Sequence, residues 1–190
     1  MRVLACLLLS VAPLMLGGCY TVRLNPIPVV EASPLPISAA VEISEQTSAF
    51  TYDVSSFAAG AANRWRILVG EALVQYAEAY LRPVFPQGDD VSISVSIQSF
   101  DVHDFEAHID AQFTVSREGE ILFDERYHTN GKGYFAQTVW AGAFAMKSSM
   151  RKTTDEALRS LFERFLSDVG ASYTGWVTEE VEVPVEPVGS

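Results

Sequence analysis

Alternating apolar and polar residues predict several β-strands in the middle of the chain. Over residues 91–98, valine and isoleucine occupy the odd positions, while serine and glutamine occupy the even ones. The same two-residue period runs through residues 37–43, 106–115 and 121–127, and residues 50–54 suggest a further short pairing segment. Because side chains alternate between the two faces of a strand, each segment is expected to bury one face of a sheet.

A first amphipathic helix is predicted over residues 64–81. Apolar side chains recur there at the 3.6-residue spacing that places them on one side of a helix. Asn63 is the expected N-cap, because its side-chain oxygen can accept a hydrogen bond from a free backbone N–H of the first turn. Pro83 is expected to end the helix.

A second helix is predicted between Thr153 and Gly170. Thr153 and Glu156 fit a capping box, in which each side chain bonds to the backbone N–H of the other. Apolar residues recur at helical spacing over residues 158–169. Gly170 is expected to end this helix, because glycine readily adopts the left-handed conformation of a C-cap.

The hairpin between the strands at 106–115 and 121–127 can be predicted from parity. Apolar residues occupy odd positions in both strands, so residues that face each other must have numbers with an even sum. A three-residue loop at 117–119, with Gly119 in the left-handed region, satisfies this condition. The resulting register pairs Val115 with Ile121, Phe113 with Phe123, Asp110 with Arg126, and His108 with His128.

Together these elements predict an α+β fold in the order β-α-β-β-β-α. The strands are expected to form one mixed, mostly antiparallel sheet. Two helices would pack on its apolar face and complete a two-layer globular domain over residues 37–170.

The composition supports one folded domain and argues against nucleic acid as a partner. The 190 residues are 48% hydrophobic, which is enough to build a core. The chain has 24 acidic and 13 basic side chains and a net charge of −11, which would repel a phosphate backbone. No patch of lysine and arginine interleaved with aromatic residues offsets that repulsion.

The first 18 residues have the pattern of a secretory signal peptide. Arg2 supplies a positive charge, an apolar run follows, and two glycines precede Cys19. The apolar run is interrupted by Pro13 and is shorter than the roughly 20 residues that a membrane-spanning helix needs.

Leu16-Gly17-Gly18-Cys19 resembles the lipobox of bacterial lipoproteins. The resemblance implies cleavage before Cys19 and lipidation of its thiol, with palmitate expected among the acyl chains. Several acyl chains would make the membrane anchor effectively permanent. An ordinary secretory signal and a retained membrane anchor are the alternatives.

Cleavage at this site would remove Cys6 and leave Cys19 as the single cysteine, so no internal disulfide is expected. In the lipoproteins that this sequence resembles, an aspartate after the cysteine favours retention in the inner membrane. Tyr20 occupies that position here. We therefore expect a protein anchored by lipid to the outer membrane and facing the periplasm.

Both ends of the mature chain are expected to lie outside the globular domain. Residues 19–36 contain Cys19 and four prolines, which predict an extended tether that holds the domain away from the bilayer. Residues 171–190 include an acidic stretch with two prolines and are expected to be disordered. This tail is interpreted as solubilising, with a docking strand for a basic partner surface as the alternative.

Catalytic motifs do not stand out in the sequence. It contains neither a Gly-x-Ser-x-Gly nucleophile elbow nor a glycine-rich phosphate loop, so no enzyme activity, cofactor or metal is expected. His108 and His128, with Asp110 or Glu106 nearby, could bind a transition metal weakly, but a solvated polar face is favoured. The carboxylates of residues 101–106 are interpreted as a solvated turn, with a weak cation site as the alternative.

An apolar stretch at residues 134–146 precedes the second predicted helix and carries Trp140 and Phe144. One interpretation is a short helix packed on the core. The other is an exposed patch that contacts a protein partner, an identical subunit or lipid. Trp140 and Phe144 are therefore the candidate partner-binding residues.

The chain resembles the small proteobacterial envelope lipoproteins of the YajG type and, more loosely, the auxiliary lipoproteins of ABC transport systems such as PqiC. The likeness lies in the lipobox, a strand at Val41 to Ile43, the helix at 64–81, the VSISVSIQSFDV strand and the EALRSLFERFLSDV helix. It implies a noncatalytic role in the envelope and supplies no active-site residues.

The expected function is therefore that of an accessory or assembly subunit of an envelope complex, in transport or envelope maintenance, with a homo-oligomer as one possible form. A periplasmic carrier of lipid or a small ligand is an alternative that requires a sizeable apolar cavity. An activator of a cell-wall enzyme or a flagellar assembly lipoprotein is another.

Overall fold

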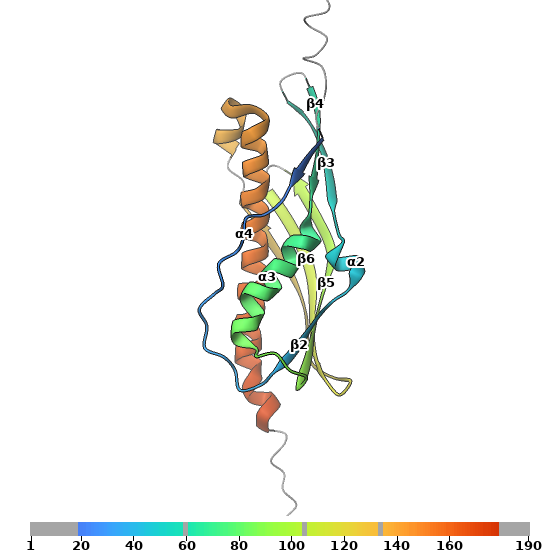
Figure 1. Ribbon diagram of the computed structural model, residues 1–190, viewed down its shortest axis with the longest axis vertical. Helices are drawn as coiled ribbons and strands as arrows, with labels where there is room; N and C mark the ends of the chain where they lie inside the picture. Colours follow the sequence, from blue (N-terminus) through green and yellow to red (C-terminus); the bar gives the residue numbers. More distant parts are fainter. Residues whose placement is uncertain (1–18, 59–60, 104–105, 133–134, 179–190) are drawn as a thin grey trace, which may run out of the picture.

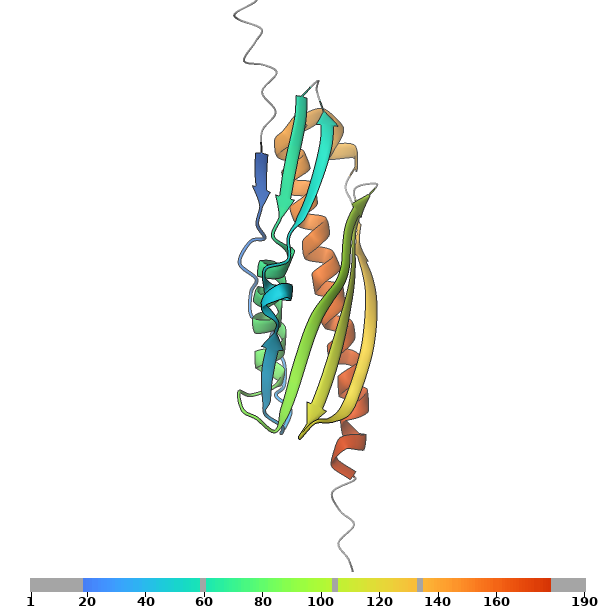
Figure 2. The same ribbon diagram turned by 90° about the vertical axis from the view of Figure 1, so that its right-hand side faces the viewer.

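The computed structural model describes residues 19–58, 61–103, 106–132 and 135–178 (Figure 1). The elements, in chain order, are β1 (Cys19–Val22), β2 (Ala39–Ile43), α2 (Glu45–Ser48), β3 (Tyr52–Ala58), β4 (Ala61–Ile67), α3 (Val69–Val84), β5 (Val91–His103), β6 (Glu106–Arg117), β7 (Glu120–Gly131) and α4 (Phe135–Thr178). They form an elongated molecule, and α4 runs along most of its length (Figures 1 and 2).

The larger sheet has the strand order β2-β5-β6-β7. β5, β6 and β7 are antiparallel, and β2 pairs with β5 in the parallel direction. The two-residue period predicted the buried faces of β5 and β6 correctly, because odd-numbered apolar residues such as Ile93, Ile109 and Phe113 are fully buried. Val41 of β2 and Ile121 of β7 were also expected on the buried face, but both are exposed. The sheet is mixed and mostly antiparallel, as the sequence predicts.

α3 and α4 cover the apolar face of this sheet (Figure 1). Tyr76 of α3 stacks on Phe162 of α4 with ring centroids 5.9 Å apart. Phe113 of β6 stacks on Phe165 of α4 at 4.3 Å. All four side chains are fully buried. The predicted α+β fold with two helices on one face of a sheet is therefore confirmed.

The smaller sheet, of order β1-β4-β3, is absent from the sequence prediction. Its central strand β4 covers residues that were expected to begin a helix. Trp65 and Ile67 are buried while Arg64 and Arg66 are exposed, which is the two-residue period of a strand. This alternation runs directly into the helical spacing of α3, so the apolar positions of the two elements merge into one apparent stripe.

The predicted start of the first helix is therefore wrong. Asn63 lies in β4, and α3 begins at Val69 after Leu68, whose side chain makes no capping hydrogen bond. The predicted end is close to the observed one, because Pro83 lies in the last turn and α3 ends at Val84.

The last helix is much longer than the sequence predicts. α4 has 44 residues and begins at Phe135, so the apolar stretch at 134–146 continues into the following helix instead of forming a separate short one. Gly170 does not end α4, which continues to Thr178. The first residues of the expected disordered tail are thus helical, and residues 179–190 lie outside the described part of the chain.

The predicted capping box is also wrong, because both of its residues bond to the sheet. The Thr153 hydroxyl donates to the Gly131 carbonyl and accepts from the Ala107 N–H at 2.9 Å. The Glu156 carboxylate accepts from the Lys132 N–H at 3.2 Å. These polar side chains lie inside α4 because they satisfy backbone groups at the end of the β6–β7 pair.

A two-residue turn joins β6 and β7 instead of the predicted three-residue loop. Glu118 and Gly119 have φ angles of 51° and 88°, as a tight hairpin turn requires. Between Ser116 and Val115 a bulge leaves one residue of β7 unpaired. From Val115 onward, paired residues therefore have numbers with an even sum, as the alternating pattern requires. The observed register pairs Val115 with Phe123, Phe113 with Glu125, Gln112 with Arg126, Asp110 with His128, and His108 with Asn130.

The proline-rich segment is not a free tether. Its first residues form β1, and residues 23–38, here called the strap, run along α3 (Figure 1). Val30 and Leu35 donate their backbone N–H groups to carbonyls of α3 at 3.2 and 2.7 Å. Proline keeps the strap extended, and half-buried residues such as Ile27 pack against the core between the prolines.

Candidate functional site

Cys19, the candidate lipidation residue, begins β1 at one end of the elongated molecule (Figure 1). Its thiol is exposed and forms no disulfide. β1 pairs with β4 in the parallel direction, so Cys19 faces Arg64 and Thr21 faces Arg66. These four residues are exposed on the same side of the small sheet.

The opposite side of β1 holds the strand in place. Tyr20 stacks on Trp65 with ring centroids 4.6 Å apart, and Val22 is 1% exposed. This packing turns Cys19 toward solvent. Sequence reasoning missed the strand, although Tyr20 and Val22 alternate with polar residues and give a short two-residue period.

One ion pair lies on the Cys19 side of the small sheet. Arg66 forms a bidentate pair with Asp53, with N···O distances of 2.8 and 2.9 Å. The hydrogen bond from this guanidinium lowers the pKa of the Asp53 carboxyl. Together with Cys19 and Arg64, these two side chains line a shallow pocket of about 340 Å³.

Two further segments reach the same end of the molecule (Figure 2). One is the hairpin of β3 and β4, and the other is the first turns of α4. Trp140 and Phe144, the candidate partner-binding residues, lie in this part of α4, but their side chains fall outside the described residues.

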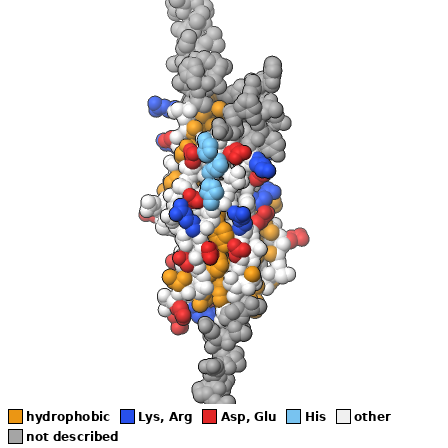
Figure 3. Space-filling view, turned by 180° about the vertical axis from the view of Figure 1, so that it is seen from behind, with side chains coloured by type: hydrophobic (Ala, Val, Ile, Leu, Met, Phe, Trp, Pro, Cys, Tyr) orange, Lys and Arg blue, Asp and Glu red, His pale blue; other side chains and the backbone are white. Residues whose placement is uncertain are grey.

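The three histidines gather on the polar face of the larger sheet (Figure 3). His103 stacks on His108 with ring centroids 4.2 Å apart, and His108 lies 5.9 Å from His128. They come from β5, β6 and β7. Pairing of His108 with His128 was predicted directly across the hairpin, and the observed register instead places Asp110 opposite His128.

The first and last histidines of this row, His103 and His128, each lie within hydrogen-bond distance of a carboxylate. Nδ1 of His103 lies 2.8 Å from Asp101, and Nδ1 of His128 lies 3.1 Å from Asp110. Hydrogen bonds from Tyr52 and then His103 lower the pKa of Asp101. No three His, Cys, Asp or Glu side chains of the described residues are grouped so that they could hold a metal ion.

The acidic run at residues 101–106 spans the β5–β6 hairpin. Asp101 and His103 lie in β5 and Glu106 begins β6, so most of the run belongs to two paired strands, and the predicted solvated turn stays a prediction. Residues 104 and 105, at the tip, lie outside the described part of the chain.

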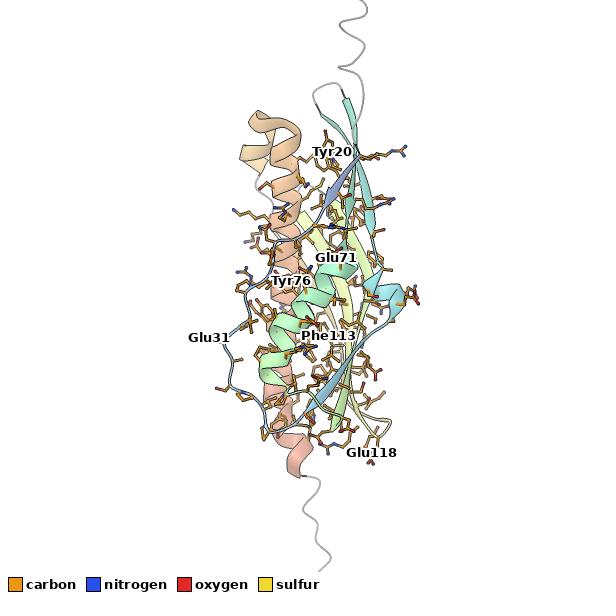
Figure 4. All side chains as sticks on the ribbon, viewed as in Figure 1. Tyr20, Glu31, Glu71, Tyr76, Phe113 and Glu118 are labelled. Carbon is orange, nitrogen blue, oxygen red and sulfur yellow. The ribbon has the colours of Figure 1, made fainter. Side chains whose placement is uncertain are left out.

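Aromatic side chains pack between the helices and the larger sheet, among them Tyr76 and Phe113, which Figure 4 labels. Phe113 and Phe162 meet edge to face at 5.5 Å, and Tyr76 lies next to Phe162. The Tyr76 hydroxyl donates to the Asp155 carboxylate at 2.6 Å. Burial, followed by this hydrogen bond, raises the pKa of Tyr76.

Among the residues that the structure describes, no helix has the length and apolar character that crossing a membrane requires.

The sequence matches no protein-family model and no curated protein. The fold is similar to that of the protein XCC0632 from Xanthomonas campestris, of the DUF330 family, with a TM-score of 0.52 and 9% identity over 83% of this chain and 99% of that one. A predicted lipoprotein from Caulobacter crescentus CB15 aligns with a TM-score of 0.35 and 12% identity over 54% of this chain and 83% of that one.

Proposed function

We propose that this protein is a lipoprotein anchored through Cys19 to the outer membrane, facing the periplasm. There it serves as a noncatalytic accessory or assembly subunit of an envelope complex. The single observation that carries the proposal is the position of Cys19. It follows a leader that ends in Leu16-Gly17-Gly18, and its thiol is exposed at one end of the molecule.

An accessible thiol is a physical requirement of this proposal. Acyl chains on a buried or cross-linked cysteine could not reach a bilayer without disrupting the fold. Cys19 is exposed because the half-buried Tyr20 and the buried Val22 occupy the opposite face of β1. Tyr20, in place of aspartate after the cysteine, supports the outer membrane as the destination.

The packed interior supports an accessory role over that of a lipid carrier. A carrier needs an apolar cavity large enough to hold its ligand. Between the helices and the larger sheet, rings of Tyr76, Phe113, Phe162 and Phe165 lie at stacking distances. The polar sheet face with its histidine row offers a surface for a protein partner (Figure 3).

The anchor is tested by comparing the native protein with Cys19→Ser and Cys6→Ser variants in bacterial cells. Intact-mass analysis of the native protein should show loss of residues 1–18 and addition of acyl chains. The Cys19→Ser variant should lack the acyl mass. On detergent phase separation it should no longer partition into the detergent phase. The Cys6→Ser variant should behave as native, because Cys6 leaves with the leader. A native chain that is unacylated or keeps its first methionine contradicts the proposal.

The accessory role is tested by crosslinking in cells followed by mass spectrometry. One protein recovered in stoichiometric amount supports a subunit of a complex. Copurified lipid without a protein partner would support the carrier instead.

A further inference from the structure

The first part of the strap crosses α4 and forms a groove with it on the surface of the molecule (Figure 1). The groove has a volume of about 330 Å³, which suits a small ligand. Residues 25–28 of the strap form one wall and carry no charge. The other wall is one face of α4, because its residues recur every three or four positions. They are Ser148, Arg151, Lys152, Asp155 and Arg159.

The α4 wall of this groove is basic, although the protein is acidic. Residues 147–152 contain three basic side chains and no acidic one, in a chain with a net charge of −11. Asp155 is the only carboxylate among the residues that line the groove. Its Oδ1 accepts a hydrogen bond from the Tyr76 hydroxyl at 2.6 Å, and its Oδ2 lies 3.3 Å from Nη2 of Arg159. Asp155 therefore serves Tyr76 and Arg159 and does not neutralise Arg151.

Arg151 is the groove residue whose charge most needs an anion. Its side chain is half-buried, and its Nη1 donates to the neutral side-chain oxygen of Asn25 at 3.0 Å. Its Nε is buried without a hydrogen-bond partner among the described residues. No carboxylate in the described part of the chain forms an ion pair with it. A partly buried cation without a counter-charge is unfavourable, and a bound anion would offset this penalty.

We propose that the groove between the strap and α4 binds the phosphate group of an organic phosphate ester. The guanidinium of Arg151 matches the geometry of phosphate oxygens and can bind two of them. The Lys152 ammonium and the Ser148 hydroxyl lie on the same wall and supply further donors. A phosphate has enough oxygens to accept from all three groups, whereas a carboxylate has only two. The uncharged strap wall faces the organic part of the ligand.

This site goes beyond the proposed function and does not depend on the lipid anchor, because Cys19 does not line the groove. Two sources could supply the phosphate group. One is a small soluble ester, and the other is the headgroup of an anionic phospholipid. Both present the same chemistry to Arg151, so the experiment must separate them.

The first test is isothermal titration calorimetry of the full chain in nonionic detergent. The probes are inorganic phosphate, glycerol phosphate and acetate. The two phosphate compounds should bind, and acetate should bind at least about tenfold more weakly, because it cannot use all the donors. Acetate that binds as tightly as phosphate would overturn the assignment and indicate an acidic protein segment as the ligand.

Thermal melts with phospholipid in detergent micelles separate the two sources. A ligand that binds only the folded state raises the melting temperature as its concentration rises. Binding of glycerol phosphate in the calorimeter supports the site with a soluble ester as its ligand. A melting temperature that rises with phosphatidylglycerol but not with phosphatidylcholine, without binding of glycerol phosphate, supports it with a lipid headgroup. No response to any phosphate compound or lipid overturns the proposal.

An Arg151→Gln variant tests the central residue of the site. It should weaken phosphate binding at least about tenfold while the thermal melt without ligand stays unchanged. The matched control is Arg164→Gln, which removes the same charge from α4. The Arg164 guanidinium donates to the His128 carbonyl at 3.1 Å and does not line the groove. Equal losses of affinity in the two variants would reflect overall charge and overturn the site.

An Asp155→Asn variant keeps the proposal testable if Arg151→Gln does not fold. Asparagine still offers an oxygen to the Tyr76 hydroxyl, and it removes the only carboxylate that lines the groove. Phosphate should then bind several-fold more tightly, because a nearby negative charge is gone. Unchanged or weaker phosphate binding in a folded Asp155→Asn variant would contradict the position of the anion. Because these measurements do not involve Cys19, their failure leaves the proposed anchor standing.

Discussion

Gly131, the last residue of β7, lies directly against the backbone of Thr153 in α4. A Cβ at Gly131 would stand 1.8 Å from the Thr153 carbonyl oxygen and 2.9 Å from the Ala157 nitrogen. The sheet and the long helix therefore meet here backbone to backbone. Only glycine permits this approach, because every other residue would place an atom inside the helix wall.

A Gly131→Ala variant should lower the free energy of unfolding by about 3 kcal/mol, because the new methyl group must push α4 away from β7. The matched control is Gly170→Ala. Gly170 is exposed within α4, and a Cβ there would meet nothing within 4 Å. The control should raise stability by about 0.8 kcal/mol through helix propensity. Urea denaturation measures both, and equal effects of the two substitutions would contradict the close approach.

Two adjacent buried threonines should differ in how their replacement by valine changes the unfolding free energy. Thr153→Val removes a hydroxyl that serves both the Gly131 carbonyl and the Ala107 N–H, so it should cost about 2 kcal/mol of unfolding free energy. The Thr154 hydroxyl is buried without a hydrogen-bond partner among the described residues. Thr154→Val should therefore be neutral or stabilising by up to about 1 kcal/mol. Thermal melts of the two variants check the contrast, which fails if Thr154→Val is the more damaging change.

Stability should fall in alkaline solution because of two tyrosines that bond to α4. Burial, then a hydrogen bond to a carboxylate, raises the pKa of Tyr76 and of Tyr127 in the folded state. The folded protein then holds these protons after the unfolded chain has begun to lose them. The stabilisation that these two tyrosines supply is fully present below the unfolded pKa of about 10 and is lost as the pH rises above it.

Tyr76→Phe and Tyr127→Phe variants should each flatten this alkaline loss. Each removes one titrating hydroxyl, and each should cost about 1 kcal/mol at neutral pH through the lost hydrogen bond to Asp155 or Asp168. Denaturant unfolding measured from pH 7 to pH 11 compares the slopes. A native slope that persists in both variants would mean that other groups cause the loss.

The β6–β7 turn should become more stable with asparagine at position 118. Glu118 has a φ angle of 51°, and Gly119 follows at 88°. Asn-Gly is the favoured pair for a two-residue turn in which both residues have positive φ. Glu118→Asn should raise the unfolding free energy by about 0.5 kcal/mol, and Glu118→Val should lower it, because a β-branched residue tolerates positive φ poorly. Calorimetry of the two variants decides, and a Val variant as stable as the Asn variant would contradict the turn geometry.

Strands with one buried face were the most predictable part of this fold. In β6 every odd residue from 107 to 115 is fully buried, so local periodicity and tertiary packing agree. In β5 the agreement breaks after Ile97, where a bulge moves the buried face to Phe100. Nothing in the local pattern marks the bulge, because its position depends on how β5 pairs with β6.

The sequence predicted the ends of the helices poorly because distant contacts decide them. Thr153 and Glu156 match a capping box in type and spacing, yet their partners are backbone groups at the end of the β6–β7 pair. Gly170 matches a C-cap, yet α4 continues past it. In both places a residue with a local preference for a helix end lies inside a long helix.

The sequence identified the candidate lipidation residue, but it did not predict the residues that surround it in the fold. The lipobox identified Cys19 as the candidate for lipidation, which stays a prediction. Its pairing with Arg64 depends on a four-residue strand and a parallel partner far along the chain. The prolines that follow suggested a free tether, because their composition carries no sign of the α3 surface on which the strap lies.

The parallel pairing of β1 with β4 also determines how a mechanical load would enter this protein. Cys19 is the first residue of β1, so tension applied to its sulfur would act along the strand axis. Such a load shears the ladder and strains its hydrogen bonds together, whereas a pull across the strands would open them one by one. If Cys19 carries the proposed lipid anchor, a force from the bilayer would therefore reach the protein first through the hydrogen bonds between β1 and β4.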